Sequence, residues 1–198
     1  MIPFILASSS PRRQELLKQV NYSFEIITKD TSEQVEENLL PEKLVLQLAN
    51  RKAEAVFVDH PDKIVLGADT IVAKAGSILG KPESKEEAFQ MLKLLSGSKH
   101  SVYTGVTILS RDQTQHFYQQ TDVEMYELTD DEIMRYLNSG EPIGKAGSYA
   151  IQGLGAYLVK EIKGDYNNVV GLPLAKVMRA LAAYSIFPEN KKLNSWKE

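Results

Sequence analysis

Two adjacent arginines stand at the start of a predicted helix, where backbone N–H groups without partners already make the local field positive. In Ala7–Arg13, Ser10 is the expected N-cap and Pro11 the first helical residue. Acidic residues usually occupy such a turn, and each cation there loses roughly 0.3–1 kcal/mol against the helix dipole. A phosphate would reverse this cost by taking hydrogen bonds from the N–H groups, the serine hydroxyls and the guanidinium groups. We therefore expect an anion site, the alternative being that Arg12 and Arg13 lie on a solvated face.

A lysine interrupts the apolar face of a second predicted helix, which runs from Pro41 to about Phe57. Lys52 follows Leu44 and Leu48 at i, i+4 spacing, so it lies on or beside the buried side of this helix. Its amine can reach water past an apolar stem that packs against its neighbours. Alternatively, the ammonium group points into a polar cleft, and the sequence leaves both interpretations open.

A carboxylate and a hydroxyl follow an apolar strand predicted over 63–67. Asp69 and Thr70 come where this strand is expected to end, which is the usual place of ligand chemistry in an open α/β sheet. The small residues Gly67 and Ala68 leave room for a ligand close to the backbone. An aspartate at a strand end also commonly closes a turn, so the motif admits a structural interpretation.

Two glycine-containing segments further along the chain present single polar side chains. Lys81 stands in a predicted turn, where its ammonium group would serve as a point charge for phosphate. The segment 144–153 is dense in glycine and contains Gln152, whose amide can both donate and accept hydrogen bonds, as recognition of a base edge requires. A tight structural loop explains the same glycine spacing equally well.

Composition limits the classes of partner. The chain has 198 residues, 43% of them hydrophobic and 25% charged, a net charge of −3 and no cysteine. A net negative charge argues against nonspecific binding to nucleic acid. The apolar N-terminus predicts a first strand rather than a signal peptide, and we expect no membrane span because the chain lacks a run of about 18 apolar residues. The absence of cysteine fits a reducing compartment, so we expect a cytoplasmic protein.

Strand and helix patterns alternate along the chain, which indicates an α/β sheet. Capping boxes at Ser84–Glu87 and Thr129–Glu132 mark two helix starts. We expect one domain of two lobes over 1–187 and a polar tail over 188–198. Strands are expected over 4–7, 22–28, 63–67, 100–109 and 116–126, and helices over 11–20, 41–57, 85–95, from Thr129 and from Pro173.

Together the motifs resemble the Maf family of nucleoside triphosphate pyrophosphatases. Their order and joint presence, from position 5 to position 173, make the resemblance specific. The matching segments are Ala7–Arg13, Arg51–Ala53, Gly67–Thr70, Leu79–Pro82, Lys145–Gly147, Ile151–Gly153 and Gly171–Pro173.

The resemblance implies an inosine-triphosphatase-like α/β fold of the Maf and Ham1 type, a mixed twisted sheet with flanking helices and two lobes around a central cleft. It also implies a homodimer and a hydrolysis, dependent on Mg²⁺ or Mn²⁺, that releases pyrophosphate from a nucleoside triphosphate. The branch that prefers dTTP and UTP carries Arg12, Thr70 and Gln152 in these places, whereas the 7-methyl-GTP branch has other residues there. The substrate-binding residues expected are Ser8, Arg12, Arg13, Lys52, Thr70, Lys81 and Gln152.

Asp69 is expected to activate the attacking water, directly or through a bound metal ion, and Glu33 is the expected second metal ligand. Two positions depart from the family pattern: Gly144 stands where an aspartate is common, and Ser32 rather than a carboxylate precedes Glu33. The family name derives from inhibition of septum formation, so a link to cell-division arrest and to nucleotide-pool cleaning is implied as well. The alternative function is a nucleotide-binding regulator of septum formation without significant turnover.

Overall fold

The first strand, β1 (Phe4–Ala7), is buried along its whole length, as expected of a short apolar run in the interior of a sheet. The computed structural model describes residues 4–32 and 39–189, and within them β1 belongs to a seven-stranded sheet of order β2-β1-β3-β5-β6-β7, with β4 paired to β3. β1 is parallel to β2 and β3, and the other pairs are antiparallel. The remaining strands are β2 (Phe24–Ile26), β3 (Val65–Lys74), β4 (Ser77–Leu79), β5 (Lys99–Leu109), β6 (Thr114–Met125) and β7 (Val159–Lys163).

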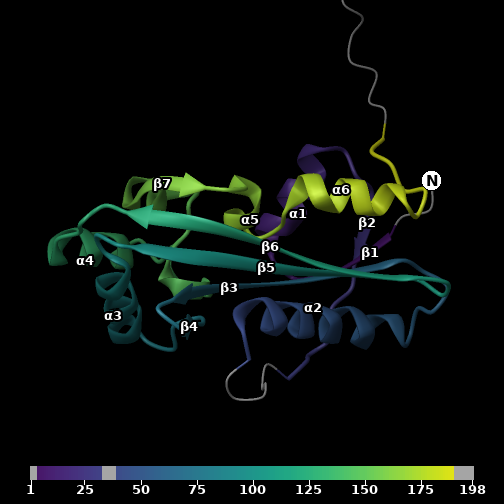
Figure 1. The fold of residues 1–198 in the computed structure, drawn as a ribbon, viewed down its shortest axis with the longest axis horizontal. Coiled ribbons are helices and arrows are strands. Elements are labelled where there is room, and N and C mark those ends of the chain that lie inside the picture. The colour runs from purple at the N-terminus through teal and green to yellow at the C-terminus, as the bar shows by residue number, and fades with distance from the viewer. Residues whose placement is uncertain (1–3, 33–38, 190–198) are drawn as a thin grey trace, which may run out of the picture.

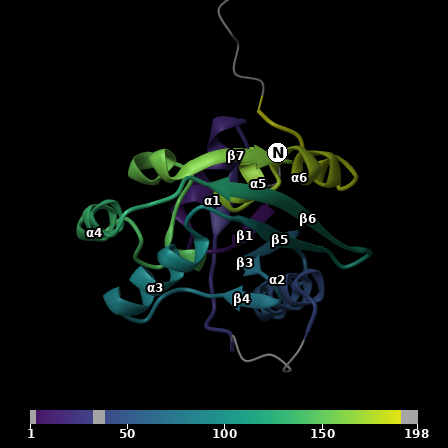
Figure 2. The ribbon, with the colours of Figure 1, turned by 60° about the vertical axis from the view of Figure 1, so that its left-hand side comes forward.

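Parallel neighbours require crossover connections, and helices supply them on both faces of the sheet. Helix α1 (Pro11–Gln19) connects β1 to β2, and α2 (Pro41–Phe57) precedes β3. Figure 1 shows α1 and α6 (Leu174–Ala182) above the sheet and α2 below it, and the turned view of Figure 2 keeps this layering. The sheet is therefore covered on both faces, with separate apolar cores against α1 and α6 and against α2.

A further core lies at the far end of the long hairpin of β5 and β6, where α3 (Lys85–Leu95) and α4 (Asp130–Asn138) pack together. The short helices η1 (Ala146–Ser148), η2 (Gly153–Leu158) and α5 (Tyr166–Val170) lie in the connections on either side of β7. These connections contain the glycine-dense segment singled out in the sequence.

Two glycines let α2 pack directly on the sheet. A Cβ atom at Gly105 would lie 2.3 Å from the carbonyl oxygen of Val45, and one at Gly67 would lie 2.4 Å from that of Ala49. Both neighbours are backbone atoms, which cannot move aside as the end of a flexible side chain can. The contact between helix and sheet thus depends on the absence of side chains at these positions.

Several predictions of local structure are confirmed. The helices expected over 41–57 and 85–95 have these bounds, and Thr129 and Glu132 form the complete capping box. Only half of the capping box predicted at Ser84 is present. The Ser84 side chain accepts a hydrogen bond from the amide of Glu87, but the Glu87 carboxylate accepts from the amide of Glu83 instead of that of Ser84.

Other predictions were wrong in detail. β3 does not end at Asp69 but continues to Lys74, because residues 68–73 keep pairing with β5. The strand expected over 22–28 is limited to Phe24–Ile26. Ser10 holds the N-cap position of α1, yet its side chain makes no capping hydrogen bond. Positions 190–198 of the predicted tail lie outside the described residues.

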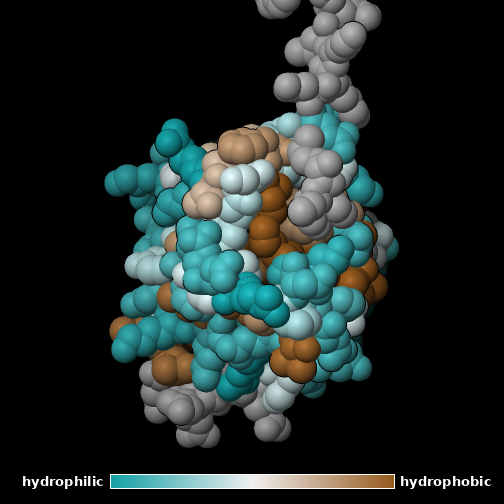
Figure 3. Space-filling model, turned by 90° about the vertical axis from the view of Figure 1, so that its right-hand side faces the viewer, coloured by the Kyte–Doolittle hydropathy of each residue, from teal (hydrophilic) through white to brown (hydrophobic). Residues whose placement is uncertain are grey.

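No helix in the described ranges combines the length and apolarity needed to cross a membrane. The end of the molecule that bears the turn between β5 and β6 is mainly hydrophilic, with patches of hydrophobic residues among the hydrophilic ones (Figure 3). Scattered exposed apolar groups of this kind are normal on a folded domain.

Gly105→Ala should lower the free energy of unfolding by about 1–3 kcal/mol, because the new methyl group overpacks the contact between β5 and α2. Urea unfolding followed by circular dichroism measures the loss. Gly80→Ala is the matched control, since a Cβ there meets no atom within 4 Å, and it should change stability by less than about 1 kcal/mol. Equal effects of the two variants would contradict the role assigned to Gly105.

Candidate functional site

A cavity of about 640 Å³ opens at the carboxyl ends of the parallel strands β1 and β2, within the size range of small-molecule sites. β3 extends past the end of β1, so its residues Asp69, Thr70 and Val72 form part of the cavity wall. The lining comes from eight segments: residues 7–13, Thr28 and Lys29, Lys52, residues 69, 70 and 72, Lys81, Val102, residues 143–146 with Tyr149, and residues 169–171.

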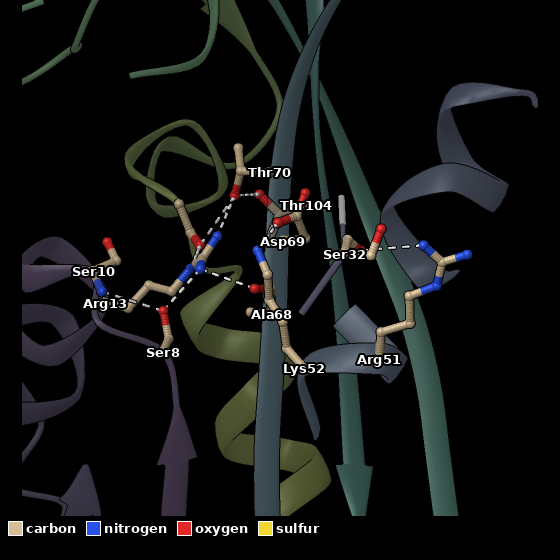
Figure 4. A network of polar contacts seen from close by, with 11 residues as sticks. Ser8, Ser10, Arg13, Ser32, Arg51, Lys52, Ala68, Asp69, Thr70 and Thr104 are labelled. Atoms are coloured by element: carbon tan, nitrogen blue, oxygen red, sulfur yellow. Dashed lines mark hydrogen bonds and ion pairs between the residues drawn. The ribbon is translucent and has the colours of Figure 1, made fainter. Parts of the chain in front are cut away.

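Lys52 and Asp69 form an ion pair in this cavity (Figure 4). The side chain of Lys52 is 21% exposed and that of Asp69 12% exposed, so both are largely withdrawn from water. Of the two interpretations of Lys52, the structure supports the ammonium group pointing into a polar cleft. The carboxylate is therefore held beside a cation and still faces the cavity.

Arg13 is buried and bonded to protein atoms (Figure 4). Its Nε donates to the carbonyl of Gly171 at 2.8 Å, Nη1 donates to Ser8 Oγ and to the carbonyl of Ala68, both at 2.9 Å, and Nη2 donates to Thr70 Oγ1 at 3.0 Å. Four hydrogen bonds use most of the five N–H donors of a guanidinium group. Arg13 thus ties α1 to β3 and to the loop before α6, and it offers a ligand little more than its charge.

The hydroxyl groups expected to bind substrate belong to the same network. Ser8 Oγ accepts from Arg13 and, at 3.3 Å, from the amide of Ser10. Thr70 Oγ1 lies 2.9 Å from Thr104 Oγ1 on the neighbouring strand, besides accepting from Arg13. Ser8, Arg13 and Thr70 all line the cavity, but their hydrogen bonds within the protein give them a clear structural role there.

The described part of the lining carries six cationic side chains and one carboxylate, that of Asp69. Burial lowers the pKa of Arg12, and it also lowers the pKa of Lys145, which the nearby charge of Arg12 lowers further while Glu141 opposes the shift. Both cations would be stabilised by an anion in the cavity. The six cations are Arg12, Arg13, Lys29, Lys52, Lys81 and Lys145.

A divalent metal ion fits this donor set in one specific way. Mg²⁺ commonly binds through one or two carboxylates together with substrate phosphates and water, and Asp69 supplies one such carboxylate. No group of three metal-binding side chains occurs within residues 4–32 and 39–189. The other predicted ligand, Glu33, lies outside the described residues.

The structure brings Ser8, Arg12, Arg13, Lys52, Asp69, Thr70 and Lys81 to one cavity. Gln152 is not among the described residues that line it and instead holds the N-cap position of η2. Lys29 and Lys145 were not predicted as site residues. Lys29 follows the parallel strand β2, so its place at the carboxyl end of the sheet is a signal that could have indicated it. Lys145 begins a segment that matches the family, Lys145–Gly147, which is the signal that could have indicated this residue.

Fold and site together define an α/β protein with a cationic ligand cavity at the carboxyl ends of its parallel strands. The chain matches the family described as Maf-like protein over residues 3–184, and it belongs to that family. It is 50% identical to a dTTP/UTP pyrophosphatase of Bacillus cereus over 94% of this chain and 97% of the relative. It is 51% identical to one of Halalkalibacterium halodurans over 93% and 97%. Among solved structures it is similar to a HAM1 protein from Coxiella burnetii, with a TM-score of 0.49 and 15% identity over 92% of this chain and 100% of the other.

Arg13→Lys should lower the free energy of unfolding by about 2–4 kcal/mol, because an ammonium group cannot reproduce the four bonds of the buried guanidinium. Arg12→Lys, the matched control, should change it by less than about 1 kcal/mol, because Arg12 is only partly buried. Urea unfolding of both variants beside the parent measures the difference. A larger loss in Arg12→Lys would show that the structural role of Arg13 is misassigned.

A buried histidine supports the cavity wall from behind. His100, 4% exposed, has its Nε2 at 2.7 Å from the hydroxyl of Tyr149, a cavity residue. The pKa of His100 is lowered to about 4, mainly by burial and to a smaller extent by the charge of Lys74, while Asp122 opposes the shift. The ring is therefore neutral in the folded protein near pH 7.

Because an unfolded chain protonates this histidine near pH 6.5, stability should fall as the pH drops from about 6.5 to about 4, by roughly 3 kcal/mol from His100. His100→Gln, which can still bond Tyr149, should remove this component. Urea unfolding of both proteins between pH 4 and pH 8 gives the difference curve. Parallel curves across that window would mean that His100 is not buried in its neutral form.

Proposed function

We propose that this chain is a nucleoside triphosphate diphosphatase that hydrolyses dTTP and UTP to the monophosphate and pyrophosphate. The observation that carries the proposal is the ion pair of Asp69 and Lys52 in a cavity with an excess of cations. A triphosphate brings about four negative charges, which must be neutralised before a nucleophile can approach phosphorus. Relatives named dTTP/UTP pyrophosphatase at about half identity over nearly the full length support the same activity.

Asp69 is the proposed general base. Its carboxylate accepts a proton from a water molecule as the water oxygen forms a bond to the α-phosphorus. The bond between the α-phosphorus and the oxygen bridging to the β-phosphate breaks, and that oxygen leaves with the electron pair as part of pyrophosphate. Lys52 orients the carboxylate through their ion pair and places a positive charge next to the reacting phosphate.

Four of the other five cations are proposed to bind and stabilise the phosphate groups. Arg12, Lys81 and Lys145 line the cavity and are proposed to contact the phosphoryl oxygens, while Arg13 contributes charge from its buried position. A divalent metal ion held by Asp69 and the phosphates would supply further neutralisation of charge at the phosphate groups. Glu33 stays the proposed second ligand on the family resemblance.

The choice of base is proposed to depend on Thr70 and Gln152. Thr70 lines the cavity, and its hydroxyl is fixed by Arg13 and Thr104. Gln152 is the N-cap residue of η2, so contact with a base requires the substrate to extend from the cavity toward that helix. A role in the cytoplasm as a homodimer, in nucleotide-pool cleaning and cell-division arrest, is carried over from the family resemblance.

Asp69→Asn should reduce pyrophosphate release from dTTP and UTP by roughly 10²–10⁴-fold, since an amide cannot accept the proton of the attacking water. Release is measured with Mg²⁺ or Mn²⁺ over a panel of dTTP, UTP, CTP, dATP, GTP and 7-methyl-GTP. Asp130→Asn is the matched control: it also removes a carboxylate from a Lys–Asp pair, but an exposed one, and should leave turnover unchanged.

Undiminished release in Asp69→Asn would overturn the assignment of the base. Nucleotide binding by the parent protein without any release would instead favour the alternative of a nucleotide-binding regulator.

A further inference from the structure

The carboxylate of Glu141 closes a loop of the cavity wall from outside the cavity. Its Oε1 accepts from the amide of Gly155 at 2.9 Å and from the hydroxyl of Tyr136 at 3.0 Å, and its Oε2 accepts from the amide of Leu154 at 2.8 Å. The Tyr136 hydroxyl, deeply buried, also accepts from the amide of Ala150 at 3.1 Å. Burial would raise the pKa of Glu141, but these hydrogen bonds together hold it below its usual value. One ionised side chain thus joins both ends of the segment 141–155.

The loop that Glu141 closes positions two lysines of the site. Lys145 Nζ donates to the backbone carbonyl of Glu141, and the amide of Gly147 donates to the carbonyl of Gly80 at 3.0 Å, next to Lys81. Glu141 itself is not among the described residues that line the cavity. The loop contributes to the lining Ile143, Gly144, Lys145, Ala146 and Tyr149.

A glycine confirms how closely the loop surrounds the carboxylate. Gly153 has φ +64°, and a Cβ atom there would lie 2.6 Å from Glu141 Oε2. A side chain at this position would both strain the backbone and displace the carboxylate. Gly153→Ala therefore disturbs the same contact from the opposite side.

We propose that Glu141 is a positioning residue for the nucleoside triphosphate: it closes the loop 141–155 and so holds Lys145 and Lys81 where the phosphates bind. The inference rests on the proposed function for the identity of the ligand. Glu141 acts through the loop and does not touch the reacting atoms. Its removal should therefore weaken substrate binding and spare the chemical step.

Glu141→Gln tests this, because an amide offers one acceptor oxygen and turns an N–H₂ group toward donors that the carboxylate satisfied. KM for dTTP should rise about tenfold, while kcat stays within about threefold of the parent. Hydrogen exchange at the amides of Leu154 and Gly155 should accelerate in the same variant. Both effects are measured on the full chain at a temperature where circular dichroism shows it folded.

Two further variants sharpen the test. Gly153→Ala should give the same rise in KM, and the double variant should add little to either single one, because both break one contact. Glu132→Gln is the matched control: it makes the same substitution on α4, where the capping contact accepts an amide, and should leave KM and exchange at Leu154 unchanged.

An unchanged KM in Glu141→Gln would overturn the proposal. A loss of kcat at constant KM would also overturn it, because it would indicate that Glu141 contacts the reacting groups. If the parent releases no pyrophosphate from any nucleotide, the proposed function fails, and the dissociation constant of dTTP measured by calorimetry replaces KM. A higher dissociation constant in Glu141→Gln then supports the positioning role, and an equal one rejects it.

Discussion

The close approach of α2 to the sheet is the constraint on which the site depends. Gly67 and Gly105 present bare backbone to this helix, so α2 packs with its own backbone against the strands. Side chains alternate along β3, so Asp69 lies on the same face of the sheet as Gly67. Gly105 on β5 is the residue paired with Asp69. Lys52 reaches the carboxylate because the helix that carries it lies at this short distance. The ion pair is thus a consequence of helix-to-sheet packing rather than of a mobile loop.

Successive side chains of β3 point to opposite faces of the sheet. Thr70 points to the face opposite Asp69, where it meets the guanidinium of Arg13 and the hydroxyl of Thr104. Burial lowers the pKa of Arg13, and the nearby charge of Asp69 opposes that shift. A buried cation bonded only to neutral acceptors requires such compensation. Asp69 therefore contributes to the stability of the Arg13 network as well as to the proposed reaction.

The sequence predicted most of this arrangement where regular periodicity or a capping motif governs the local structure, as in α2 and α4. Helix α5 was not predicted, because its five residues are too few to show a helical period. The predicted end of β3 was too early, because Gly67 and Asp69 are residue types that are unusual within strands. The burial of Arg13 was accessible in principle, since Arg13, Leu16 and Leu17 share i, i+3, i+4 spacing on the buried face of α1. The contacts of Glu141 could not be predicted from the sequence. Its carboxylate binds backbone amides thirteen and fourteen residues further along the chain, and the loop between them has no periodicity that would indicate this contact.

The excess of cations in the cavity gives the position of the Glu141 carboxylate, just outside the lining, a physical reason. Arg12 and Lys145 lie close enough that the charge of Arg12 lowers the pKa of Lys145, so the two cations repel each other. A carboxylate within the lining would relieve this repulsion but would also compete with phosphate for the same cations. Glu141 relieves it from outside the lining, where its oxygens are already bonded to Tyr136 and to two backbone amides. The cations are thereby stabilised by a carboxylate that does not occupy the cavity, and Asp69, the proposed general base, is the single carboxylate in the described part of the lining.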